Sequence, residues 1–72
     1  MQEKFSKYYK RVSNNIKSLR LKQGLSQENF AEKIGCSREY ISRLENYHEH
    51  ASLDFILKLS IIYNLEPKWF LE

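Results

Sequence analysis

Two arginines, Arg38 and Arg43, lie five residues apart in the polar segment SREYISRLEN. If this segment is helical, both arginines lie on the side opposite Ile41 and Leu44, which would face a core. A guanidinium group is planar and permanently charged, and it donates paired hydrogen bonds to a carboxylate, a phosphate or the O6 and N7 atoms of guanine. The pattern therefore predicts a helix whose inner side is packed and whose outer side can recognise such a partner.

The reactive side chains form no recognisable active site. The sequence has no glycine-rich phosphate loop, no nucleophile paired with a base and no set of four metal ligands. His48 and His50 resemble a ligand pair, but only Cys36, Glu49 and distant carboxylates could complete the shell. We expect surface histidines, and a cysteine that fills a small space in the core. The chain is predicted to be no enzyme and to use no metal, cofactor or small-molecule ligand.

Residues 26–46 contain the elements that would position the two arginines. Ser26 and Ser37 can each accept a hydrogen bond from the first turn of the helix that follows. Gly35 lies between the two helices, where a left-handed residue often ends a helix. The first helix has one apolar stripe, made by Phe30, Ala31 and Ile34. Two short helices joined by a glycine-containing turn are the helix-turn-helix pattern.

The segments SQENFAEKIG and SREYISRLEN, with IKSLR upstream and residues 53–71 downstream, resemble the phage-repressor and Cro-like (XRE-type) helix-turn-helix family. The resemblance covers about residues 12–71, and its motifs are specific as a set. It implies an all-α, five-helix bundle of the lambda-repressor-like DNA-binding type, with the helix-turn-helix at its centre. In size the chain is similar to stand-alone restriction–modification controller proteins and small phage repressors.

The same resemblance implies roles for individual residues on double-stranded DNA. The second helix would enter the major groove, where every base pair shows a distinct edge. Base readout would fall to Arg38, Glu39, Ser42 and Arg43. Glu39 would either accept a hydrogen bond from cytosine N4 or pair with Arg43, four residues further on, and so orient its side chain. Phosphate contacts would fall to Gln27, Ser37, Tyr40, Asn46, Tyr47 and His48.

Three further positions carry an expectation about geometry. In relatives, a salt bridge joins the positions of Arg20 and Glu45, and here it would fix the angle of the second helix. Breaking such a buried pair by removing one partner costs roughly 3–5 kcal/mol. Tyr47 stands where the family often has glycine. It must therefore tolerate the backbone conformation of that corner, or the corner differs.

Charge is unevenly distributed along the chain. Residues 1–25 contain seven cations and one acid, whereas residues 26–72 contain five cations and eight acids. The basic N-terminal third is either a solvated face or a phosphate-facing patch, and the neighbouring helix-turn-helix favours the patch. Seventy-two residues allow one domain, residues 1–72. The single cysteine and the lack of a run of ~18 apolar residues favour a cytoplasmic, nucleoid-associated protein of a bacterium or phage, without a membrane contact.

One helix is predicted from about residue 4 to 22, because apolar residues recur there at steps of three or four. The sequence Ser13-Asn14-Asn15 has poor helix propensity, so a helix that starts there is the alternative. The rings of Phe5, Tyr8 and Tyr9 are expected to pack over the domain. Lys4, Lys7 and Lys10 are candidates for contacts with the DNA backbone.

The C-terminal part is predicted to form two helices, at 52–63 and 67–71, with Pro67 as the first residue of the second. Its expected inward residues are Leu53, Ile56, Leu57, Leu59, Ser60 and Tyr63. An apolar patch then remains on the outer side, formed by Phe55, Ile61, Ile62 and Trp69. In the alternative, part of the Trp69 ring covers the core. Exposed apolar patches mark interaction sites, so we expect residues 52–71 to form a homodimer interface.

These features predict a transcriptional regulator, a repressor or an activator, that binds a partly palindromic operator as a homodimer. A two-fold axis would place the two recognition helices about 34 Å apart, in successive major grooves. Glu28 and Glu32 are candidates for a contact with RNA polymerase. The alternative is a protein-interaction module on the same fold, of the antitoxin or bridging-factor type.

Overall fold

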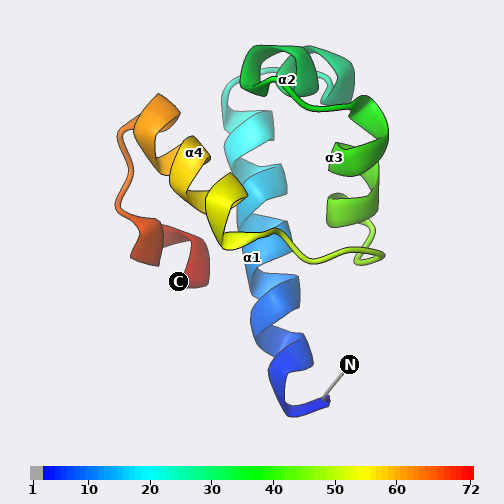
Figure 1. Cartoon of the computed structure of the whole chain (residues 1–72), viewed down its shortest axis with the longest axis vertical. Helices are drawn as coiled ribbons and strands as arrows, with labels where there is room; N and C mark the ends of the chain where they lie inside the picture. Colours follow the sequence, from blue (N-terminus) through cyan, green and yellow to red (C-terminus); the bar gives the residue numbers. More distant parts are fainter. Residues whose placement is uncertain (1–2) are drawn as a thin grey trace.

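The computed structural model describes residues 3–72, with side chains from residue 4 onward, and the regular elements of this part of the chain are all helices. Its elements are α1 (Glu3–Lys22), α2 (Gln27–Ile34), α3 (Arg38–Glu45), α4 (Leu53–Tyr63) and a short 3₁₀ helix, η1 (Pro67–Leu71). In Figure 1, α1 runs along the long axis of the molecule and α2 crosses its C-terminal end. The helices α3 and α4 are drawn on either side of α1, and the N-terminal turns of α1 extend beyond the rest.

The predicted fifth α-helix is a 3₁₀ helix, so the described chain has four α-helices rather than five. The segment from Pro67 to Leu71 has only five residues, and proline contributes no N–H group. The backbone N–H of Trp69 donates to the carbonyl of Glu66, three residues back, at 2.9 Å. A segment this short satisfies its backbone better with three-residue than with four-residue hydrogen bonds.

Serine caps and left-handed residues set the helix boundaries, and the roles of Ser26, Ser37 and Gly35 are as predicted. The hydroxyls of Ser26, Ser37 and Ser52 accept from backbone N–H groups three residues on, at 3.0, 3.1 and 3.1 Å. Gly35 ends α2 with φ of 87° and Asn64 ends α4 with φ of 55°. Each cap satisfies backbone groups that a helix end leaves without partners.

The helix α1 is continuous through Ser13-Asn14-Asn15, which confirms the longer of the two predicted helices. Tertiary contacts compensate for the poor propensity of these residues. Ser13 is buried at 2% exposure. The Nδ2 group of Asn15 donates to the carbonyls of Trp69 and Phe70 at 3.3 and 3.0 Å, which attaches η1 to α1.

The core lies between α1, α2, α3, α4 and η1, and every one of these elements contributes to it. Its fully buried side chains are Ile16, Phe30, Ile41, Leu44, Leu59 and Phe70. No helix in residues 3–72 is long and apolar enough to cross a bilayer. The three aromatic residues of the first turns remain partly exposed, with Phe5 at 46%, Tyr8 at 43% and Tyr9 at 39%.

The predicted orientation of α4 was wrong at three positions. Phe55 is buried at 7% exposure and meets the ring of Tyr40 edge-on, with centroids 5.2 Å apart, so it cannot belong to an outer patch. Leu53 and Leu57, predicted to point inward, are exposed at 68% and 40%. Because α4 carries apolar residues on nearly every side, its sequence does not define which side faces the core. Packing of Phe55 and Leu59 against the other helices decides it.

Candidate nucleic-acid interface

The helix α3 is packed on one side and free on the other. Ile41 and Leu44 are fully buried, at 0% exposure each, and they anchor the helix to the core. Arg38, Glu39 and Arg43 are exposed, and Ser42 is half-buried between them. All four predicted base-reading side chains therefore lie on the outer side of α3.

A buried ion pair fixes the C-terminal end of α3, as the resemblance implied. The Arg20 guanidinium donates from Nε and Nη2 to the two carboxylate oxygens of Glu45, at 2.7 and 2.9 Å. Its Nη1 group donates to the carbonyl of Leu25 at 2.8 Å, and the Nε2 group of Gln27 donates to Glu45 Oε1 at 3.0 Å. The cluster joins the end of α1, the start of α2 and the end of α3. Removing one member would leave a buried charge without its partner.

Gln27 is thus engaged inside the protein before any partner arrives. Its side chain is half-buried and donates to Glu45. Its position at the first turn of α2 nevertheless places it at the positive end of a helix, where anions bind. The predicted phosphate contact of Gln27 stays a prediction.

The two arginines of α3 differ in their partners. The Nε group of Arg43 donates to Glu49 Oε1 at 2.7 Å, whereas Arg38 approaches Glu39 at 3.5 Å. The acid that holds Arg43 is therefore Glu49 of the following loop, and Glu39 lies beside Arg38 instead. This role of Glu49 is not predicted by the sequence. An acid six residues after an arginine, beyond the end of the helix, matches no helical spacing rule.

Tyr47 occupies the corner after α3 in a left-handed conformation, with φ of 65°. It therefore tolerates the conformation for which the family often uses glycine. Its hydroxyl donates to Asn14 Oδ1 at 2.5 Å, and the Nζ group of Lys10 lies 5.6 Å from the centre of its ring. A left-handed conformation costs a residue with a side chain about 1–2 kcal/mol. The contacts with α1 offset part of that cost.

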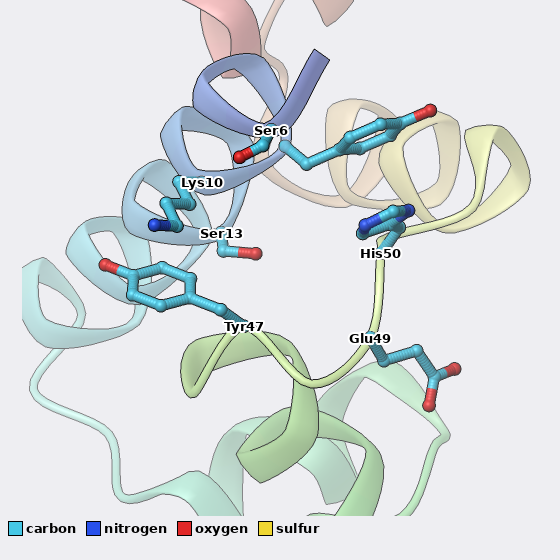
Figure 2. A pocket seen from close by; sticks show the side chains of 7 residues that line it. Ser6, Lys10, Ser13, Tyr47, Glu49 and His50 are labelled. Atoms are coloured by element: carbon cyan, nitrogen blue, oxygen red, sulfur yellow. The ribbon is translucent and has the colours of Figure 1, made fainter. Parts of the chain in front are cut away.

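A second contact joins the same loop to α1. The rings of Tyr9 and His50 are stacked, with centroids 3.7 Å apart and planes within 4°. Figure 2 shows Tyr47 and His50 of the loop on the side of α1 that carries Ser6, Lys10 and Ser13, while the Glu49 carboxylate points away from α1. The cavity between them measures only about 30 Å³, which is room for water rather than for an organic ligand.

The other five predicted phosphate-contacting residues lie at the two ends of α3. Ser37 and Tyr40 lie in its first turn, where the Ser37 hydroxyl is used as the cap and the Tyr40 ring rests on Phe55. Asn46, Tyr47 and His48 follow its last turn and are exposed. The structure thus places these residues on either side of the four base-reading candidates, the arrangement that a groove-binding helix needs.

His48 and His50 resemble a metal-ligand pair in the sequence, and Cys36 is the single thiol of the chain. Within residues 4–72, no three His, Cys, Asp or Glu side chains gather into a group able to hold a metal ion. Cys36 is half-buried beside the core. Burial raises the pKa of its thiol above the ordinary value, and the Lys58 ammonium opposes that shift in part.

Comparison with known proteins gives three findings. Residues 16–70 match the domain family described as helix-turn-helix. A 45-residue stretch, 62% of this chain, is 40% identical to the propionyl-CoA carboxylase regulator of Cereibacter sphaeroides, and it spans 10% of the length of that regulator. The fold is similar to the crystal structure of the restriction–modification controller protein C.AhdI from Aeromonas hydrophila. That match has a TM-score of 0.74 and 32% sequence identity, and it covers 86% of this chain and 94% of C.AhdI.

Proposed function

Because this chain belongs to the helix-turn-helix family, of the XRE type, we propose that it is a sequence-specific DNA-binding transcriptional regulator. The observation that carries the proposal is the outer side of α3. It presents Arg38 and Arg43 to solvent, while Ile41 and Leu44 hold the inner side in the core. The likeness to a restriction–modification controller, which covers 86% of this chain and 94% of that protein, supports the proposal.

In this proposal α3 lies in the major groove. Arg38 and Arg43 donate to guanine O6 and N7, and each correct pairing contributes about 1–3 kcal/mol of discrimination between bases. Ser42 lies between them and contacts a base edge or the backbone. The first turns of α2 and α3 and the loop after α3 bind phosphates, which set the register of the helix in the groove.

We further propose that the protein acts as a homodimer on a partly palindromic operator. The support comes from α4, where Leu53, Leu57 and Ile61 follow one another at steps of four residues and are all exposed. Ile62 beside them is exposed at 39%. An apolar stripe of this kind is typical of an interaction site. A second copy packed on it would give the two-fold symmetry that places two α3 helices in successive major grooves.

Selection of bound duplexes from a random DNA pool tests the proposal. The expected result is an enriched sequence with two related half-sites. In a gel shift on that sequence, Arg38→Ala and Arg43→Ala should each bind less tightly and lose preference at separate base positions. Lys33→Ala, an exposed cation at the end of α2, serves as the control and should bind as the unaltered protein does.

The alternative function, a protein-interaction module of the antitoxin or bridging-factor type, predicts a different outcome. No sequence would then be enriched, and both arginine variants would behave as the unaltered chain. Whether the protein represses or activates transcription follows from the position of the operator relative to the promoter. We further propose that Glu28 and Glu32 contact RNA polymerase. Both acids are exposed on α2, which is the observation that supports such a contact.

A further inference from the structure

One side of α1 carries a row of polar side chains, three of them lysines, that the helix-turn-helix does not account for. Lys7, Lys10, Asn14 and Lys17 are spaced by three, four and three residues, so they lie on one side of the helix. All four are exposed, whereas Val12, Ile16 and Leu19 on the other side are buried. We call Lys7, Lys10, Asn14 and Lys17 the α1 strip.

Two contacts place the α1 strip beside the loop that follows α3. The Asn14 side chain accepts the hydroxyl hydrogen of Tyr47, and the Lys10 ammonium lies over the same ring. Figure 2 shows Lys10 and Tyr47 facing each other across the gap between α1 and the loop. The strip is therefore continuous with residues 46–48, which are proposed to bind phosphates next to the groove. Because the strip is part of the continuous helix α1, its position relative to α3 is fixed, unlike that of a flexible N-terminal arm.

The charges of the strip are available for a partner. Among residues 4–72 the ion pairs join Arg20 to Glu45, Arg38 to Glu39 and Arg43 to Glu49, and none of them uses a lysine of the strip. The rise of a helix makes the strip about 15 Å long between Lys7 and Lys17. That length equals about four base steps along one DNA strand, whose phosphates repeat every ~3.4 Å of axis.

From these observations we propose that the α1 strip is a second DNA-binding surface, which binds the phosphate backbone flanking the groove read by α3. The inference rests on the proposed function and extends it. Lysine ammonium groups act as point charges on phosphates and read no base edges. The strip therefore lengthens the footprint and raises affinity equally for every sequence.

The test measures the dissociation constant for the selected operator and for a scrambled duplex at several salt concentrations. In Lys7→Gln/Lys10→Gln/Lys17→Gln, the slope of log affinity against log salt should fall by about two to three, because each lost phosphate contact removes ~0.9. Affinity should fall at least about tenfold for both duplexes, and the ratio between them should not change. The triple replacement by arginine should keep the original slope.

The matched control is Lys33→Gln/Lys58→Gln/Lys68→Gln, which removes the same charge from exposed positions on α2, α4 and η1. Its slope should stay within about one of the unaltered protein. An equal change of slope in the two triple variants would mean that only net charge matters. An unchanged slope in Lys7→Gln/Lys10→Gln/Lys17→Gln would mean that the strip contacts no phosphate. Either result overturns the inference while operator binding stands. A chain that selects no operator would instead overturn the proposed function.

Discussion

Arg43, a predicted base reader, donates from Nε to Glu49 Oε1 at 2.7 Å, so an acid of the α3–α4 loop holds it before DNA is present. Both side chains are partly exposed, at 48% and 38%, and such pairs add little to folding. The contact bears on recognition instead. It engages Nε and leaves the two Nη groups to face the paired acceptors of guanine. The carboxylate also opposes the approach of a misplaced phosphate.

Glu49→Gln should therefore lower sequence discrimination. Binding to scrambled DNA should strengthen by about fivefold, since one repelled charge near phosphate is worth about 1 kcal/mol, while operator binding should change less. The measurement is the ratio of the two dissociation constants at one salt concentration. Glu66→Gln, which removes an exposed acid from the turn before η1, is the control. An unchanged ratio in Glu49→Gln would show that the pair with Arg43 is incidental.

The buried pair Arg20–Glu45 should matter for stability. Glu45→Ala leaves the Arg20 guanidinium buried at 8% exposure without its carboxylate, so unfolding free energy in urea should fall by roughly 3–5 kcal/mol. Arg20→Met/Glu45→Met should lose less than Glu45→Ala alone, because no charge is left unpaired. Glu39→Ala, on the exposed side of α3, should change stability by no more than about 0.5 kcal/mol. A loss in the double variant as large as in Glu45→Ala would contradict this account.

The strained corner at Tyr47 gives a prediction about backbone energy. Tyr47→Ala and Tyr47→Gly both lose the ring and its hydrogen bond to Asn14, but only glycine adopts φ of 65° without strain. Tyr47→Gly should thus be more stable than Tyr47→Ala by about 1 kcal/mol or more. Tyr47→Phe keeps the ring and should lose about 0.5–1.5 kcal/mol at most. Thermal unfolding of the three variants measures these differences, and equal stability of the first two would mean that the corner relaxes.

Two substitutions on α4 should separate assembly from folding. Ile61→Glu places a charge on a side chain that is 82% exposed, so the fold should persist while sedimentation shows a monomer. Phe55→Ala empties a buried site and should cost about 3–5 kcal/mol of folding free energy. Analytical ultracentrifugation and circular dichroism distinguish the two effects. A dimer that survives Ile61→Glu would move the proposed interface away from α4.

Cys36 should react slowly at neutral pH. Burial raises the pKa of its thiol, and only the thiolate attacks an alkylating reagent. The native chain should therefore be alkylated more slowly at pH 7.5 than the chain unfolded in urea.

Because the native pKa of the Cys36 thiol is the higher one, the protonated thiol favours the folded state. That contribution is complete below the ordinary cysteine pKa of about 8.5 and is lost as pH rises through the native pKa. Cys36→Ser should show a flatter decline of stability in this alkaline range. Equal alkylation rates in the two states would contradict the prediction.

The sequence by itself determined the elements and the side of α3 that is free. Capping serines three residues before the N–H groups that donate to them, Gly35, and the alternation of Ile41 and Leu44 with the arginines are local patterns, and local hydrogen bonds and helical periodicity act on them directly. The basic N-terminal third was likewise a property of composition. These features do not depend on contacts between distant parts of the chain.

Tertiary structure decided what local patterns leave open. The rotation of α4 depends on whether Phe55 or Leu57 fills the space beside α3, and both are equally apolar in sequence. The partner of Arg43 depends on where the loop brings Glu49, because a charged side chain pairs with whatever acid lies within reach. The continuity of α1 through Asn15 depends on hydrogen bonds to η1, more than fifty residues away in the chain. In each case, packing, an ion pair or hydrogen bonds between distant segments override or complete the local preference.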